Sequence, residues 1–238
     1  NTDKEQEVVE TAEETVVDEK DSKIAELEKD LAAAKEAHIR TLAEYDNVEI
    51  VFGDVMKQTL IDIENKLGEE YIMVANLPYY ITTPIIMRFL ENSQKIKAMV
   101  IMVQEEVAYR LASKESTSDY GAITVAINLR GSAKVVMRVP REKFTPAPNV
   151  DSAVVKIVMD AQKFAGVDFE RVRNLVRCAF SSRRKMLVNN IMNTYKMSRA
   201  DVETALNNCE IKLTVRGENL TAENFVDLAY ELPYKGDK

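Results

Sequence analysis

Short apolar runs alternate with amphipathic segments through the middle of the chain. Three runs, residues 48–52 (VEIVF), 71–75 (YIMVA) and 97–103 (KAMVIMV), have the composition of parallel strands that are buried on both faces. Two later runs, residues 134–140 and 152–159, look like antiparallel strands that close the sheet. Helical periodicity lies between these runs, at residues 59–68, 83–93, 104–113 and 120–130. The pattern predicts an α/β domain over residues 47–162.

The periodicity is helical from there to the end of the chain. The main candidate segments are residues 169–192, 198–209 and 221–232, and Thr221 with Asn224 gives a weak capping signal at the start of the last one. This predicts a small all-helical domain over residues 163–238.

Residues 1–46 differ from the rest in charge, with 15 acidic and 6 basic residues. Residues 1–22 have no aromatic side chain, so we expect a disordered tail there. From Ser22 to Tyr45, apolar positions recur at spacings of three and four, which predicts an acidic helix. The later positions of this heptad seam are Ala, His and Thr, which are weakly apolar or polar. A single solvated helix and a coiled coil are therefore equally compatible with it. We expect a monomer unless this helix pairs.

The remainder of the chain is mildly basic, and residues 163–216 carry 11 basic against 5 acidic residues. The densest basic cluster is SSRRKM at residues 181–186. Such a cluster is either a solvated helical face or a set of contacts to nucleic-acid phosphates, and the basic region around it favours RNA. The candidate RNA-binding residues are Arg177, Arg183, Arg184 and Lys185.

Composition argues against several other classes of site. The chain has a single histidine, His38, and two cysteines, Cys178 and Cys209, far apart in the sequence. A histidine-based metal site, a Ser-His-Asp triad and a cysteine metal site are therefore not expected. The two cysteines sit in apolar-periodic stretches and are interpreted as buried free thiols, so we expect a cytoplasmic protein. Apolar runs stay well below the ~20 residues of a membrane span, so we expect no membrane partner.

The stretch NLPYY, residues 76–80, follows a predicted strand directly. Pro78 fixes its own φ and favours an extended Leu77, so the chain makes a stiff corner where ligands of open α/β sheets bind. The Asn76 side-chain oxygen and the Leu77 carbonyl could accept both hydrogens of an exocyclic amino group, and Tyr79 offers a ring for stacking. This arrangement suits an extruded adenine, although a plain strand-to-loop turn would have the same sequence.

Six blocks in order resemble the KsgA/Dim family of rRNA adenine N6,N6-dimethyltransferases, from about Asn47 to Leu232. They are VANLPYYITTPIIMRFLE, MVQEEVAYRLAS, DYGAITV, KFTPAPNVDSAVVKI, AFSSRRKMLVNNI and RGENLTAENFVDLA. The resemblance implies a Rossmann-like sheet that binds S-adenosylmethionine, a C-terminal domain that embraces rRNA, and a small-subunit rRNA or pre-ribosomal substrate.

The resemblance also implies roles for individual residues. Asn76, Leu77, Pro78 and Tyr79 hold and stack the target adenine, and Asn76 lies close to the methyl donor. Phe144 covers the base from the other side. Gly53 and Asp54 bind the adenosine part of the cofactor, although Asp54 taken alone would be an ordinary turn residue.

One part of the family pattern is missing. Gly53 is the first glycine of the chain, so no glycine-rich turn precedes it. Residues 22–46 are instead similar to the N-terminal coil of GrpE. We therefore expect the chain to keep the adenine pocket and the RNA-binding face, and to bind S-adenosylmethionine poorly or not at all.

Three functions follow from the sequence. The first is dimethylation of adenine in small-subunit rRNA, with a macrolide-resistance type enzyme acting on large-subunit rRNA as a close variant. The second is an inactive module that binds rRNA or the pre-ribosomal subunit. The third is a cochaperone-like interaction through residues 22–46.

Overall fold

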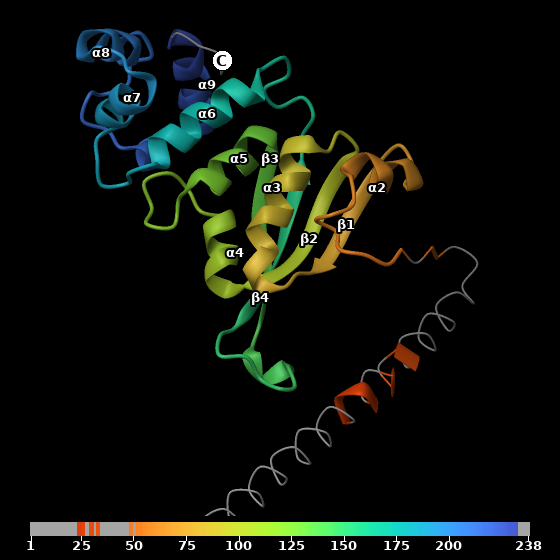
Figure 1. The fold of residues 1–238 in the computed structure, drawn as a ribbon. Helices are drawn as coiled ribbons and strands as arrows, with labels where there is room; N and C mark the ends of the chain where they lie inside the picture. Colours follow the sequence, from red (N-terminus) through yellow and green to blue (C-terminus); the bar gives the residue numbers. More distant parts are fainter. Residues whose placement is uncertain (1–22, 27–28, 31, 34–47, 50, 233–238) are drawn as a thin grey trace, which may run out of the picture. The chain divides into compact units, whose positions relative to one another are not determined.

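The structure, a computed structural model, describes residues 23–26, 29–30, 32–33, 48–49 and 51–232 (Figure 1). The chain divides into two compact units, residues 1–57 and 58–238. In the first unit, residues 23–26, 29–30 and 32–33 are helical and exposed, in agreement with the predicted acidic helix. The predicted tail of residues 1–22, most positions of the heptad seam and His38 lie outside the described residues.

The prediction of a strand at residues 48–52 is wrong for those of its residues that the structure describes. Val48, Glu49, Val51 and Phe52 belong to no strand, and Val51 and Phe52 are 50% and 66% exposed. An apolar, β-branched run forms a strand only when a neighbouring strand supplies its hydrogen bonds. The composition of a segment shows that it could form a strand, but it does not show whether a neighbouring strand is there to pair with it.

The unit of residues 58–238 contains a four-stranded sheet in the order β1-β2-β4-β3. Its strands are β1 (Tyr71–Asn76), β2 (Ile96–Gln104), β3 (Gly131–Val139) and β4 (Ser152–Met159). β1 and β2 run parallel, whereas β4 is antiparallel to both β2 and β3. The predicted α/β fold with antiparallel closure is confirmed.

Helices fill the connections and then form the C-terminal part of this unit. Among the described residues the helices before β4 are α2 (Leu60–Lys66), α3 (Thr82–Asn92), α4 (Glu105–Leu111) and α5 (Ala122–Arg130). Those after β4 are α6 (Phe169–Phe180), α7 (Leu187–Tyr195), α8 (Arg199–Asn208) and α9 (Ala222–Glu231). Short 3₁₀ turns occur at Tyr79–Ile81, Arg141–Lys143 and Gly217–Asn219. None of the described helices is long and apolar enough to cross a membrane.

Helices cover one face of the sheet, and the part of the chain that the structure describes leaves the other face of β1 exposed. α3, α4 and α5 lie over the covered face (Figure 1), where Met99, Ile101, Val155 and Ile157 are 0% exposed. On the opposite face of β1, Ile72 and Val74 are 63% and 78% exposed. The prediction of strands buried on both faces is therefore wrong for β1, because the described residues supply covering helices on one side only.

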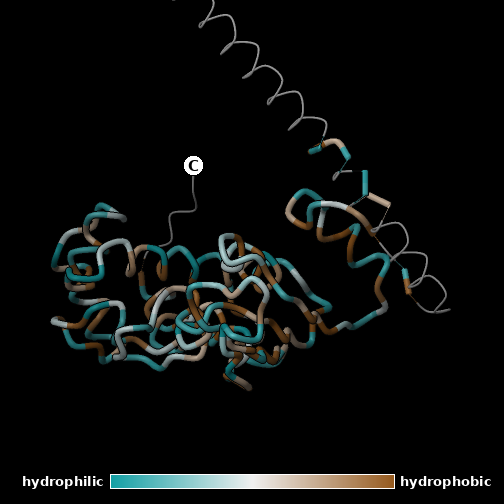
Figure 2. Tube along the Cα trace, turned by 90° about the horizontal axis from the view of Figure 1, so that it is seen from below, coloured by the Kyte–Doolittle hydropathy of each residue, from teal (hydrophilic) through white to brown (hydrophobic). Residues whose placement is uncertain are grey.

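The C-terminal helices share a core with the sheet domain. Tyr120, Val125 and Leu129 pack in one cluster with Val172 and Phe225. Brown and teal stretches alternate along the tube of this part of the chain in Figure 2, as helices with one buried face require. The predicted boundary between residues 47–162 and 163–238 remains a prediction, since residues 58–238 form one compact unit.

The cap of α9 is stronger than its sequence suggests. Thr221 Oγ1 accepts a hydrogen bond from the Asn224 backbone N–H, and Asn224 Oδ1 accepts one from the Thr221 N–H, both at 3.2 Å. The pair is thus a reciprocal capping box in which asparagine takes the place of the usual Glu or Gln, and the expectation of a weak signal was wrong.

Candidate functional site

The corner predicted at NLPYY lies at the carboxyl end of β1. Asn76 is the last residue of the strand, and its partner in the parallel ladder is Met102 of β2. Side chains alternate along a strand, so Asn76 lies on the open face of the sheet with Ile72 and Val74. The amide is therefore exposed next to an apolar surface.

The corner is rigid because its next three residues form a 3₁₀ turn that leads directly into α3. Pro78 has φ −58° and ψ 133°, an extended conformation. Its carbonyl accepts hydrogen bonds from the Ile81 N–H at 3.2 Å and from Thr82 Oγ1 at 3.0 Å. The Leu77 side chain is only 8% exposed and anchors the corner in the core.

The structure brings the five predicted base-binding residues together. A cavity of about 340 Å³ is lined by Asn76, Leu77, Pro78, Tyr79, Phe144, Pro146 and Pro148. Among the described residues, neither the Asn76 side chain nor the Leu77 carbonyl has a hydrogen-bond partner. Two acceptors and two aromatic rings on one cavity can hold a flat heterocycle that carries an amino group.

Tyr79 is held by a residue that sequence reasoning missed. Its hydroxyl lies 2.8 Å from Ser152 Oγ, and the two residues are 73 positions apart. Ser152 is the first residue of β4 and is 0% exposed. It lies in the KFTPAPNVDSAVVKI block, but only the folded chain shows which ring it contacts.

The loop that carries Phe144 is fixed by Asp151, which sequence reasoning also missed. Asp151 accepts hydrogen bonds from the Arg141 backbone N–H at 2.9 Å and from Arg138 at 2.5 Å, and Arg138 also pairs with Glu105 at 2.9 Å. The Arg141 N–H, and after it the Arg138 charge, hold the pKa of Asp151 below its ordinary value. Glu105 and Asp151 raise the pKa of Arg138 in turn.

The predicted cofactor residues Gly53 and Asp54 lie in the unit of residues 1–57, whereas the cavity belongs to the unit of residues 58–238. Asp54 begins a turn, in which its Oδ1 accepts from the Met56 N–H and its carbonyl accepts from the Lys57 N–H, both at 2.9 Å. These contacts are those of an ordinary turn residue, which was the alternative to a cofactor ligand for Asp54. Its role towards a cofactor remains a prediction.

The described residues around the cavity fit a base better than they fit S-adenosylmethionine. In residues 58–232 the glycines are Gly68, Gly121, Gly131, Gly166 and Gly217, and none follows β1 or β2 directly. A cofactor that must approach the backbone closely finds no glycine turn at this edge of the sheet. Of the three predicted cofactor residues, Gly53, Asp54 and Asn76, the lining of this cavity includes Asn76.

The basic cluster is not on a helix. α6 ends at Phe180 and α7 begins at Leu187, so Arg183, Arg184 and Lys185 lie in the turn between them. The prediction of one continuous helix over residues 169–192 is wrong, because Asn190 of α7 folds back to donate to the Ala179 carbonyl at 2.9 Å. The turn leaves all three basic side chains exposed.

These basic residues have different surroundings. Arg183 donates to the carbonyls of Ser118 at 2.8 Å and Tyr120 at 3.2 Å, and pairs with Glu218 at 3.1 Å. Arg184 and Lys185 have no ion-pair partner among the described residues. Arg183 therefore links parts of the fold, while its two neighbours have charge available for a ligand.

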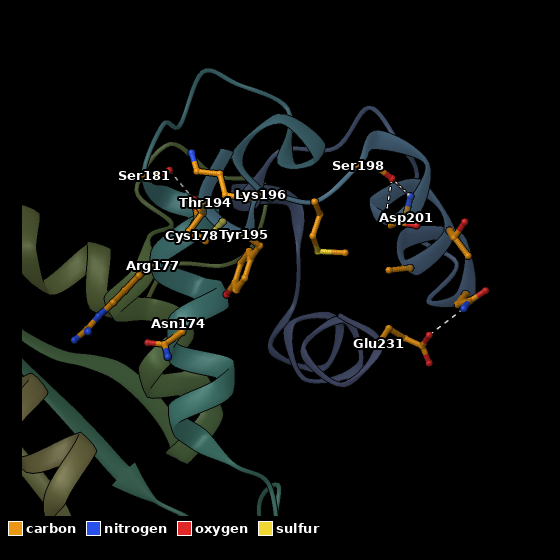
Figure 3. Close-up of a pocket in the computed structure, with 14 residues that line it drawn as sticks. Asn174, Arg177, Cys178, Ser181, Thr194, Tyr195, Lys196, Ser198, Asp201 and Glu231 are labelled. Atoms are coloured by element: carbon orange, nitrogen blue, oxygen red, sulfur yellow. Dashed lines mark hydrogen bonds between the residues drawn. The ribbon is translucent and has the colours of Figure 1, made fainter. Parts of the chain in front are cut away.

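Arg177 lies on α6 at the side of a larger groove of about 970 Å³ between the C-terminal helices. Figure 3 shows its side chain pointing away from Glu231 and from Asp201, across α6. Its guanidinium is 3.9 Å from Glu91 of α3, which also pairs with Arg173 at 3.3 Å. Arg177 is thus close to a carboxylate of α3, whereas Arg184 and Lys185 have no ion-pair partner among the described residues.

The model of the family described as "Ribosomal RNA adenine dimethylase" matches residues 6–233 of this chain. A ribosomal RNA small subunit methyltransferase A from Geobacillus thermodenitrificans is 43% identical over 202 residues, which cover 81% of this chain and 68% of the relative. The protein of the same name from Enterococcus faecalis is 41% identical over 199 residues, with the same coverage of 81% and 68%.

Two solved structures resemble the fold. A dimethyladenosine transferase from Plasmodium falciparum gives a TM-score of 0.67 at 26% identity, over 82% of this chain and 76% of that one. The 23S rRNA methyltransferase ErmE gives 0.60 at 23% identity, over 83% and 77%, and supports the fold alone. The chain belongs to the ribosomal RNA adenine dimethylase family.

Proposed function

We propose that this chain serves in the N6-dimethylation of adenine in small-subunit rRNA, as an enzyme of its family that recognises the target base at the Asn76–Phe144 cavity. The observation that carries the proposal is the cavity itself, where two unpaired acceptors and two aromatic rings meet at the carboxyl edge of the sheet. The small-subunit substrate follows from the names of relatives at 38–43% identity, whereas the large-subunit enzyme is a neighbour in fold only.

In this proposal the base is held by its edge and by its faces. Asn76 Oδ1 and the Leu77 carbonyl each accept one hydrogen of the N6 amino group. Tyr79 and Phe144 contact the two faces of the ring and hold it by stacking. Gripping both hydrogens leaves the nitrogen lone pair less delocalised into the ring and directed away from the protein.

S-adenosylmethionine would supply the methyl groups of the family reaction. The contribution of the described residues is positioning, which can lower a barrier by several kcal/mol when the reacting atoms are aligned. No general base is needed if the nitrogen attacks before it loses its proton.

RNA outside the target base would be held by the turn between α6 and α7. Arg184 and Lys185 are exposed and unpaired among the described residues, so they suit phosphate contacts that carry no sequence information. Replacing both by Gln is expected to lower the slope of log Kd against log salt by about 1.4 for single-stranded RNA. Arg183→Gln would instead lower thermal stability, because Arg183 holds backbone carbonyls.

A second function is favoured by the open face of β1 and by the lack of a glycine turn in the described residues beside Asn76. In that case the chain recognises adenine in pre-ribosomal RNA without transferring a methyl group. Calorimetry of the purified chain with S-adenosylmethionine separates the two, since binding at micromolar concentration supports the enzyme.

The direct experiment is methyl transfer from labelled S-adenosylmethionine to small ribosomal subunits that lack the modification. The enzyme predicts labelled dimethyladenine in the small-subunit rRNA, and loss of the label with Asn76→Ala. Binding of adenine-bearing RNA without any label would support the second function. A reaction on ribosomes would take place in the cytoplasm, with a chain that is monomeric unless residues 22–46 pair.

A further inference from the structure

The orientation of the Tyr79 ring depends on one hydrogen bond. The ring is 38% exposed, so packing alone leaves it partly free to turn. Its hydroxyl is tied to Ser152 Oγ at 2.8 Å. No other hydrogen bond reaches the Tyr79 side chain from the described residues.

Ser152 is anchored in the sheet by a neighbouring strand on each side. It pairs with Gln104 of β2 on one side and with Val139 of β3 on the other, so β4 is held from both edges. The preceding residue, Asp151, accepts hydrogen bonds from Arg138 and from the Arg141 N–H, and its carbonyl accepts one from the Glu105 N–H at 3.0 Å. A buried hydroxyl fixed in this way can hold a partner ring in one orientation.

We propose that Ser152 is a positioning residue for target-base recognition, which acts by holding the Tyr79 ring parallel to the base plane through the hydroxyl–hydroxyl hydrogen bond. The inference rests on the proposed function, because the ring matters only if a base enters the cavity. Ser152 itself touches neither the base nor a cofactor in this arrangement.

The test measures how much the base contributes to RNA affinity. A fluorescein-labelled RNA hairpin with an unpaired loop adenosine is compared with the same hairpin that is abasic at that position, and the ratio of the two Kd values is read by anisotropy. Ser152→Ala and Tyr79→Phe are each expected to lower the ratio by about 3- to 10-fold, the equivalent of one net hydrogen bond. The double variant lowers it no further, and Ser152→Thr, which keeps the hydroxyl, retains the wild-type ratio.

A control variant and the melting temperature distinguish a loss of base recognition from an effect on folding. Ser132→Ala makes the same chemical change at the far end of β3, on an exposed residue, and leaves the ratio unchanged. A purely structural role of Ser152 would lower the melting temperature and leave the ratio as it is, which would overturn the inference. Additive losses in the double variant would also overturn it. A wild-type ratio of one would overturn the proposed function together with this inference.

Discussion

The strongest prediction concerns Asn76→Ala and a substrate that lacks a single amino group. In the proposed complex the N6 amino group of adenine donates to two acceptors, Asn76 Oδ1 and the Leu77 carbonyl. Purine riboside has the same ring without the amino group, so it stacks on Tyr79 and Phe144 but donates nothing. Comparing the two ligands isolates the hydrogen bonds from the stacking.

The magnitude follows from the number of acceptors. One net hydrogen bond contributes roughly 1 kcal/mol, so two acceptors give a preference for adenine of about 2 kcal/mol, or about 30-fold. Asn76→Ala removes one acceptor and leaves the backbone carbonyl in place. The preference is then expected to fall to about 5-fold, whereas the affinity for the purine-riboside hairpin stays the same.

The assay is anisotropy of a labelled hairpin that carries adenosine or purine riboside at one loop position. Asn92→Ala provides a matched control, since Asn92 closes α3 and donates to the Arg88 carbonyl at 2.9 Å, away from the lining of the cavity. A wild-type protein that binds both hairpins equally would refute the two-acceptor arrangement. An Asn76→Ala protein with an undiminished 30-fold preference would refute the role of the side chain.

Three further predictions concern the fold around the site. Gly131→Ala places a Cβ 1.9 Å from the Val158 carbonyl oxygen and is expected to destabilise the protein by about 3 kcal/mol in denaturant unfolding, whereas Gly68→Ala, with nothing within 4 Å, changes stability by less than about 1 kcal/mol. The Tyr120 hydroxyl donates to a backbone carbonyl at 2.9 Å, and burial raises its pKa to about 12. The free energy of unfolding of the wild type should therefore be constant up to pH ~10 and fall between about pH 10 and 12. Tyr120→Phe is expected to lower it by about 1 kcal/mol at pH 7 and to remove this fall at high pH. The pKa of Asp151 is lowered by its hydrogen bonds, so the difference in melting temperature between wild type and Asp151→Asn is constant from pH 8 to 5 and shrinks as the pH falls below about 4.

Local patterns predicted the elements that carry the site. The run YIMVA became β1, the amphipathic stretch after it became α3, and NLPYY became the rigid corner between them. These features depend on residues close in sequence: Pro78 fixes its own backbone, and its carbonyl is satisfied by residues three and four positions later. Neighbouring residues suffice to determine such a corner.

What the sequence could not predict depends on distant partners. Residues 48–52 have the composition of a strand but no ladder, and β1 has an open face, because pairing and cover come from other segments. The turn at Arg183 interrupts a continuous helical pattern, since its guanidinium and the amide of Asn190 reach backbone carbonyls elsewhere in the fold. The Ser152 contact to Tyr79 spans 73 positions for the same reason.

The residues that line the cavity are held in place by different neighbours in the fold. Asn76 is positioned by the ladder with β2, Tyr79 by Ser152 of β4, and the Phe144 loop by Asp151. These supports come from β2, from the first residue of β4 and from the residue that precedes it. Among the described residues, the outer edge of β1 contributes nothing to them. If the cavity binds the target base, we expect base recognition to be measurable in this chain independently of methyl transfer.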